Sequence, residues 1–111
     1  MKPYLIQFQG FSVSVQNQQG MLILPEQLSD ELFDHIHQTV MADFKKRQVK
    51  QVRLDMSAIH ILDEMEITRL IHLCRAFRLM RLKAVFGGVT PAAAMCLAMS
   101  DFEPDEFEFQ G

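Results

Sequence analysis

The chain has 111 residues, of which 49% are hydrophobic, 23% charged and 9% aromatic, and its formal net charge is −3. These values fit one soluble domain over residues 1–111, since single domains most often run to about 100–150 residues. The acidic balance argues against nucleic-acid binding and against a polybasic membrane contact, because both need a cationic surface. Without a run of about 18 apolar residues or a signal-peptide pattern at its start, the chain is expected to be cytoplasmic and to lack a membrane span.

The first third of the chain predicts β-strands. Hydrophobic and polar residues alternate over 4–8 and again over 11–16, which is the pattern of half-buried strands. A turn is expected over 17–20, with Gly20 taking the positive φ. The short apolar run 21–24 predicts an inner strand. Together these segments indicate an N-terminal antiparallel hairpin on a larger sheet.

A helix is expected to follow, with Ser29 as its N-cap, because a serine hydroxyl accepts from a free amide of the first turn. Asp30 and Glu31 fall in that turn, where the helix dipole favours anions. Cations at 45–47 close the helix beside its last carbonyls. The apolar stripe that should face the core consists of Leu32, Phe33, Ile36, Val40 and Phe44.

The middle of the chain predicts a strand and a second helix. Residues 52–57 alternate in hydrophobicity, and a loop should lead to Asp63. Asp63 has Glu66 three residues later, the pattern of a capping box at a helix start. The expected buried stripe of this helix is Ile67, Leu70, Ile71, Cys74 and Phe77.

The last third predicts a strand over 83–86, a glycine turn at 87–88, a short helix and a final edge strand over 106–109. Thr90 should cap the helix and Pro91 should open it, at the position where proline is tolerated. Strands that alternate with helices indicate an α/β fold with a partly parallel sheet and right-handed crossovers.

The short helix from Pro91 to about Met99 contains no charged residue. A helix that is apolar all round is normally covered on more than one side. Two interpretations stay open: one face forms a partner or self-association surface, for which alanine and methionine are suited, or the helix is deeply embedded.

The residues of metal and nucleophilic chemistry lack the necessary spacing. His35 and His37 would point about 200° apart on a helix, and His60 and His72 have no cysteine or carboxylate at ligand spacing. No nucleophile motif or phosphate-binding loop is present. We therefore expect no metal, no cofactor and no catalytic residue. The two cysteines, Cys74 and Cys96, are expected to be buried reduced thiols.

Charged side chains gather on the second predicted helix. Asp63, Glu64 and Glu66 stand at its start, and Asp55 stands on the strand before it. A cap with first-turn anions explains them, but Asp55, Asp63 and Glu66 could also serve a small ligand-binding domain or enzyme. A cleft that holds a carboxyl group of raised pKa would favour the enzyme.

Basic residues occupy the other end of that helix, where Arg75 and Arg78 are neighbours on one face and Arg81 lies just beyond. Cations complement the negative end of a helix dipole, which explains them as stabilising groups. The alternative is an exposed basic strip for an acidic partner.

Two segments resemble motifs of a known family. Residues 52–64 read VRLDMSAIHILDE and residues 86–94 read FGGVTPAAA. The first resembles the core motif of STAS domains, the anti-sigma-factor antagonists, and the second their glycine-proline turn into a final helix. The order of strands and helices agrees over most of the chain, with most similarity to the short, single-domain RsbS type of stressosome proteins. The resemblance implies a mixed sheet of about five or six strands, with three to four helices mainly on one side.

STAS resemblance implies switching by protein–protein binding rather than catalysis. The implied partners are an anti-sigma-type switch kinase (RsbT-like), RsbR-like STAS proteins, or both, in a homo- or hetero-oligomer. An accessory subunit of another system, such as lipid transport, stays open, as does nucleotide binding.

The resemblance also assigns site residues. The family's phosphoacceptor follows the loop aspartate; here Asp63 matches that aspartate and Glu64, which cannot be phosphorylated, stands at the acceptor position. A second acceptor place in related scaffolds falls on Asp30, or on its neighbour Ser29. The implied partner-binding loop is Asp55, Ser57, Asp63, Glu64, Met65 and Thr68. Hydroxyls at Ser29, Ser57 and Thr68 stay open as phosphate acceptors.

Overall fold

A computed structural model describes residues 8–100 and 108–110 of the chain. Its sheet has five strands: β1 (Ser12–Gln16), β2 (Gln19–Ile23), β3 (Gln51–Asp55), β4 (Lys83–Gly87) and β5 (Glu108–Gln110). The order across the sheet is β1-β2-β3-β4-β5; the first pair is antiparallel and the other pairs are parallel. The mixed sheet and the N-terminal hairpin are thus confirmed. Most of the strand expected over 4–8, and 106–107 of the last one, lie outside the described residues.

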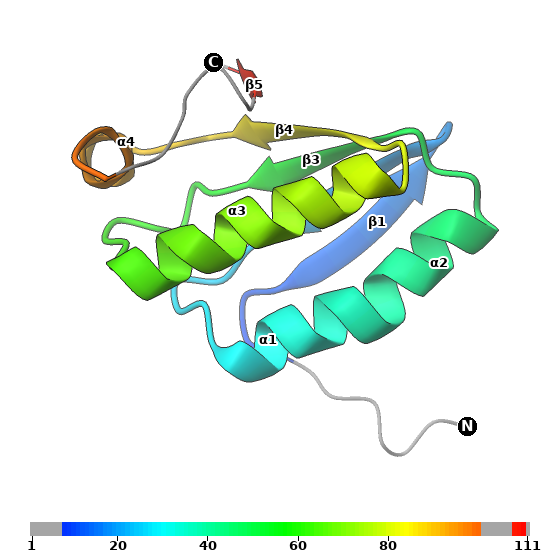
Figure 1. Ribbon diagram of the computed structural model, residues 1–111, viewed down its shortest axis with the longest axis horizontal. Helices are drawn as coiled ribbons and strands as arrows, with labels where there is room; N and C mark the ends of the chain where they lie inside the picture. The colour runs from blue at the N-terminus through cyan, green and yellow to red at the C-terminus, as the bar shows by residue number, and fades with distance from the viewer. Residues whose placement is uncertain (1–7, 101–107, 111) are drawn as a thin grey trace.

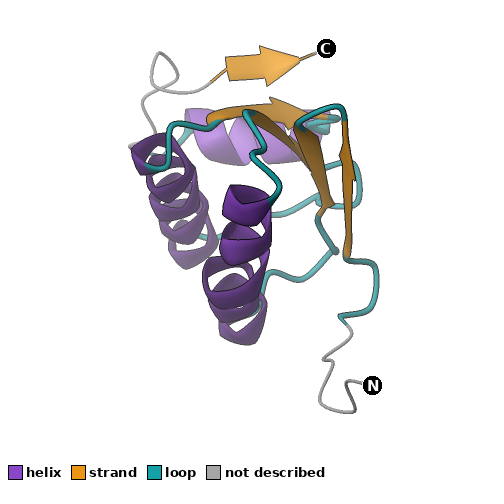
Figure 2. Cartoon of the chain, turned by 90° about the vertical axis from the view of Figure 1, so that its right-hand side faces the viewer, coloured by secondary structure: helices purple, strands orange, loops and turns teal. Residues whose placement is uncertain are grey.

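Helices cover only one face of this sheet (Figure 1). They are α1 (Asp30–His35), η1 (Ile36–Val40), α2 (Met41–Lys46), α3 (Glu64–Leu79) and α4 (Pro91–Ala98). The first three form one continuous rod that lies beside α3, while α4 stands beyond the carboxyl end of β4. Figure 2 shows the two long helices together on one side of the strands. The expected one-sided packing is confirmed, and no helix of the described residues covers the opposite face of β1, β2 and β3.

The β1–β2 turn corrects the role expected for Gly20. Asn17 and Gln18 take the positive φ angles, 53° and 64°, so the turn needs no glycine. Gly20 lies inside β2, where an added Cβ would be 2.7 Å from Cζ of Phe44. This glycine therefore serves the close approach of a helix to the sheet.

Alanine at position 20 is expected to destabilise the fold by about 1–3 kcal/mol, because the methyl group overpacks a buried ring. Gln19→Ala, one residue earlier in the same strand and on the open face, is the matched control. Urea unfolding should show the loss for Gly20→Ala only. Adding Phe44→Leu should recover part of the stability that Gly20→Ala loses; strictly additive losses would contradict the steric explanation.

The first predicted helix contains a π-helical stretch that its sequence pattern did not indicate. Ser29 caps the helix as expected, with its Oγ accepting from the amide of Leu32 at 3.2 Å. Over Ile36–Val40 the winding loosens, and Met41 donates its amide to the carbonyl of Ile36. All five residues of the predicted stripe are buried even so: Leu32, Phe33, Ile36, Val40 and Phe44.

The core lies between the sheet and the two long helices. In α3, Ile67, Leu70, Cys74 and Phe77 are buried as expected, but Leu73 takes the place assigned to Ile71, which is only half-buried. The edge of the apolar face of a helix can be predicted from sequence only to about one residue. At that edge, the packing of neighbouring elements determines which side chain is buried. The cysteine prediction is likewise half right, since neither cysteine forms a disulfide and Cys74 is buried, but Cys96 is only partly covered.

Candidate functional site

The loops that follow β3 and β4 meet at the carboxyl ends of these parallel strands. Asp55 ends β3, and its Oδ1 accepts from the amide of Ser57 at 2.9 Å and from its hydroxyl at 2.6 Å. Gly88 follows β4 with φ +64°, and an added Cβ would lie 3.2 Å from that same Oδ1. A side chain at position 88 would thus be strained in its backbone and pressed against the turn. The structure brings Asp55 and Ser57 together, and Gly88 closes over them.

The pKa of the Asp55 carboxyl lies below its usual range. Hydrogen bonds from the hydroxyl and then the amide of Ser57 are the main causes, and the positive charge of Arg53 adds to them against the opposing effect of burial. These donors stabilise the ionised form. Asp55 is therefore a weak base with its Oδ1 bound in a turn, which is the opposite of the raised pKa that the enzyme hypothesis requires.

This pKa predicts a contribution to acid stability. A carboxyl group with a lowered folded pKa stabilises the fold above its unfolded pKa of about 3.9 and loses that contribution as pH falls further. Asp55→Asn should therefore show a smaller drop in unfolding free energy between about pH 6 and about pH 2.5. Ser57→Ala, which removes the hydroxyl donor, should show part of the same change. Urea titrations at both pH values measure it, and pH dependence equal to that of the original chain in both variants would contradict it.

Helix α3 begins at the capping box that the sequence indicates. Asp63 Oδ1 accepts from the amide of Glu66 at 2.7 Å, and Glu66 Oε1 accepts from the amide of Asp63 at 3.0 Å. One oxygen of each carboxylate is thus bound to a backbone amide, as a helix cap requires. Glu64 and Met65 follow in the first turn as exposed side chains, and Thr68 is exposed one turn later.

The loop before α3 is anchored at its centre and exposed at its tip. Ile59 is fully buried, and its carbonyl accepts from the hydroxyl of Thr90 at 2.8 Å. The same hydroxyl oxygen accepts from the amide of Ala93 at 3.1 Å, so Thr90 caps α4 as expected and also joins the two loops. Ile61 is 77% exposed beyond that anchor. The sequence pattern missed both the Thr90–Ile59 link, which joins residues 31 positions apart, and the exposure of Ile61.

Asp30 stands near this surface but in another setting. It is the first residue of α1, and its Oδ1 lies 2.5 Å from Nη1 of Arg69 in α3. The ion pair joins the starts of the two long helices. Ser29 uses its hydroxyl oxygen as the cap of α1. The structure thus places Asp30 beside α3 rather than beside Glu64 itself.

Helix α4 is not embedded, so that interpretation of its apolar sequence is wrong. Ala93 and Leu97 are buried, but Met95 is 65% and Met99 is 82% exposed. A short helix that stands beyond the end of a small sheet has only one side to pack against it. The exposed side is apolar and is compatible with the partner-surface interpretation.

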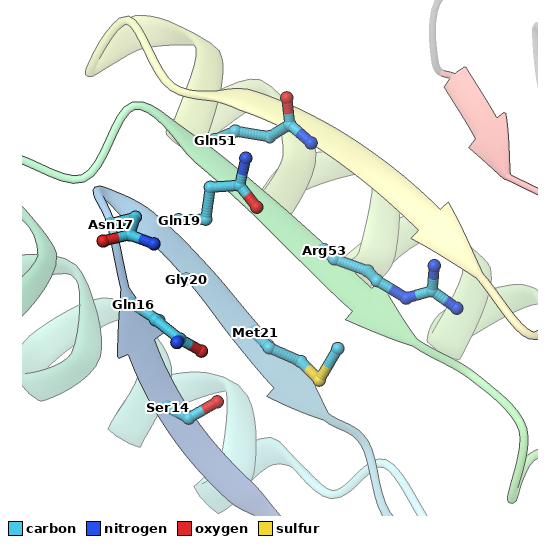
Figure 3. A pocket seen from close by; sticks show the side chains of 8 residues that line it. All are labelled: Ser14, Gln16, Asn17, Gln19, Gly20, Met21, Gln51 and Arg53. Carbon is cyan, nitrogen blue, oxygen red and sulfur yellow. The ribbon is translucent and has the colours of Figure 1, made fainter.

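The open face of the sheet carries a polar hollow of about 740 Å³, shown in Figure 3. Glutamines 16, 19 and 51, Ser14 and Arg53 spread across three strands there rather than converging on one point. Ligand pockets usually combine apolar walls with a few converging polar groups. Asp55, Asp63 and Glu66 do not line this hollow, so it gives no support to the ligand-binding alternative.

Among residues 8–100 and 108–110, no group of three or more histidine, cysteine, aspartate or glutamate side chains is placed to hold a metal ion. In the same ranges no helix combines the length and the apolar character needed to cross a bilayer.

Solved structures with the same architecture identify the fold. RsbS of Moorella thermoacetica, in a serine-to-glutamate variant, matches with a TM-score of 0.77 and 20% identity over 88% of this chain and 85% of that chain. A chain of the stressosome, described as a signal integration and transduction hub, gives 0.76 and 19% identity over 88% and 85%. SpoIIAA, an anti-sigma factor antagonist in its unphosphorylated form, gives 0.65 and 9% identity over 91% and 87%.

These likenesses show that the chain has the STAS fold, as the motif resemblance implied. The match to RsbS spans most of both chains, so the whole described domain, and not one motif, shares that architecture. No protein-family model matches the sequence, and no curated protein matches it.

Proposed function

We propose that this chain is a STAS-type regulatory module that acts by binding other proteins through the surface at the start of α3. Its partners would be an anti-sigma-type switch kinase (RsbT-like), RsbR-like STAS proteins, or both. The observation that carries the proposal is the exposure of Glu64 as the first residue of α3, directly after the Asp63 cap, in a fold shared with RsbS.

Physical chemistry explains why a charge at this place can act as a signal. The free amides and positive dipole of a helix N-terminus tolerate an anion, so charge added there scarcely disturbs the fold. It does change the surface that a partner meets, through attraction, repulsion and desolvation. Glu64 carries one negative charge, whereas a phosphate carries about 1.5–2. In this proposal Glu64 holds the surface in one charge state instead of switching it.

Exposed apolar side chains give the same surface a contact area. Ile61 and Met65 flank Glu64 in the chain and are 77% and 62% exposed. Asp55, Ser57 and Gly88 fix the loop behind them. Apolar side chains within a polar rim are typical of the energetic centre of a protein interface.

A phosphorylation assay tests the proposal. The purified chain and its Glu64→Ser variant are each incubated with an RsbT-like kinase from the same genome and ATP, and intact mass is measured. We expect one phosphate on the Glu64→Ser chain and none on the original. Thr68→Ala, combined with Glu64→Ser, controls for the neighbouring hydroxyl. Stoichiometric phosphate on Ser29, Ser57 or Thr68 of the original chain would contradict a fixed charge state.

A further inference from the structure

Most charged side chains of the described residues lie toward one of two ends of the molecule, although Arg69 pairs with Asp30 at the acidic one. Seven cations lie where α2 and α3 end and where β3 and β4 begin; this basic end comprises Lys45, Lys46, Arg47, Lys50, Arg78, Arg81 and Lys83. The sequence contains no Asp or Glu over residues 44–54 or 67–100. Asp43 pairs with Arg47 at 3.1 Å and Glu108 pairs with Lys83 at 3.2 Å, so among the described residues cations outnumber carboxylates in this region.

The basic end is a connected surface with an apolar centre. The amide of Lys50 donates to the carbonyl of Gln18 at 2.8 Å, and the amide of Lys83 donates to the carbonyl of Lys50 at 2.9 Å. These bonds hold together the β1–β2 turn, the α2–β3 connection and the α3–β4 connection around a hollow of about 810 Å³. Leu79 borders this hollow and is 87% exposed, the highest value among the large hydrophobic residues.

The opposite end carries the complementary charges. This acidic end lies at the starts of α1 and α3 and comprises Glu26, Asp30, Glu31, Asp34, Asp55, Asp63, Glu64 and Glu66. No Lys or Arg occurs over residues 3–44 or 54–68. Ile61 and Met65 are its exposed apolar side chains. Helix α3, with 16 residues, runs from one end to the other over about 24 Å.

Helix dipoles account for only part of this arrangement. Both long helices run from the acidic end to the basic end (Figure 1), and charges of these signs stabilise their first and last turns. That effect falls off within one turn. Three of the charged residues lie in strands or connections outside the helices: Lys50, Lys83 and Asp55. A helix dipole also does not explain why the apolar side chain of Leu79 is exposed among cations.

We propose that the basic end of one copy of this chain binds the acidic end of a second copy, head to tail. Glu64 and Asp63 of one copy would face Lys50 and Arg81 of the other, with Met65 entering the hollow beside Leu79. Charge and apolar contact are complementary between two surfaces of the same chain. An anionic lipid bilayer could bind the cations of the basic end, but it has no side chain to fill the partly apolar hollow beside Leu79. Such a contact is heterologous, so it continues from copy to copy instead of closing as a two-fold dimer.

Head-to-tail binding goes beyond the proposed function and competes with it. The acidic end contains the surface at the start of α3 that the proposed function assigns to another protein. A partner bound there would therefore expose the basic end of the next copy.

Sedimentation velocity of the full chain tests the contact. Between about 10 µM and about 1 mM the mean mass should rise smoothly with concentration. Successive species should differ by the mass of one chain. The association should weaken at least about tenfold between about 50 mM and about 500 mM salt, because exposed charges are screened. A monomer over the whole range at low salt would overturn the proposal.

Two variants, each with one end blocked, test whether the contact joins the basic end of one copy to the acidic end of the next. Lys50→Glu/Leu79→Ser blocks the basic end and Glu64→Lys/Met65→Ser blocks the acidic end, so each alone should be monomeric. An equal mixture should form a dimer and nothing larger, because each variant keeps the end that the other has lost. The controls Gln38→Glu/Thr39→Glu and Gln38→Lys/Thr39→Lys change net charge equally on exposed residues between the ends, and they should associate like the original chain.

Other results would overturn the proposal, and each would indicate a different alternative. Self-association of one blocked variant on its own would indicate a two-fold interface through like ends, and self-association of the original chain with no dimer in the mixture would place the contact outside this pair of surfaces. Binding of the chain to vesicles rich in anionic lipid, lost in Lys50→Glu/Leu79→Ser while the original chain stays monomeric, would assign the basic end to lipid. The proposed function stands or falls separately, because Lys50→Glu/Leu79→Ser leaves the start of α3 intact and should keep its affinity for a kinase.

Discussion

Replacing Phe44 by alanine is expected to lower the free energy of unfolding by about 3–5 kcal/mol, the usual cost of removing a buried phenyl ring. The Phe44 side chain is fully buried, and its ring stacks on that of Phe77 with centroids 6.1 Å apart. It also fills the space above Gly20, which has no side chain to occupy the cavity. Since small domains are stable by only about 5–15 kcal/mol, this one change should remove a large part of the total.

Urea unfolding followed by circular dichroism measures this loss. Leu79→Ala is the matched control, because that side chain is apolar but 87% exposed, and it should change stability by less than about 0.5 kcal/mol. A loss below about 1 kcal/mol for Phe44→Ala would mean that the ring does not join the α2 and α3 layers to the sheet as described.

Met65→Ser should weaken the binding of a partner protein about ten- to hundredfold while leaving stability nearly unchanged. Met65 lies in the first turn of α3 and is 62% exposed, so its side chain contributes little to the core. An exposed apolar residue at the centre of an interface commonly contributes about 2 kcal/mol or more to binding. The partner to titrate is the proposed one, an RsbT-like kinase or RsbR-like STAS protein from the same genome, and isothermal titration measures the dissociation constant.

Met95→Ser is the comparison variant, since Met95 is similarly exposed, at 65%, but lies on α4. A larger loss of affinity for Met95→Ser than for Met65→Ser would move the interface from the start of α3 to the apolar side of α4. Equal affinity of all three chains would exclude both surfaces.

Features that depend on neighbours in the chain could be predicted from the sequence. The caps at Ser29, Asp63 and Thr90 each involve residues within three positions, and all three form as expected. The alternation of hydrophobic and polar residues likewise located β1 and β3 to within about two residues, and the strand predicted over 83–86 matches β4. The STAS-like architecture followed from these elements and their order, together with the motif resemblance.

Features that depend on distant contacts could not be predicted. The ion pair of Asp30 with Arg69 joins residues far apart in the sequence, and Gly20 acquires its role only because Phe44 packs onto β2. The π-helical stretch over Ile36–Val40 keeps the apolar stripe inward, so hydrophobic spacing does not reveal it. For the candidate site, the sequence supplied Asp63, Glu64 and the Asp55 turn, but the anchor between Thr90 and Ile59 required the fold.

The affinity of the chain for its partner, compared with that of Glu64→Ala and Glu64→Lys, tests the central claim most directly. Titrations at low and high salt against the same RsbT-like kinase or RsbR-like protein give the dissociation constants. The account predicts weaker binding in the order Glu64, Ala, Lys, with at least about tenfold between the first and last at low salt and convergence at high salt. Three equal dissociation constants at low salt would contradict the claim that the charge at the start of α3 governs docking.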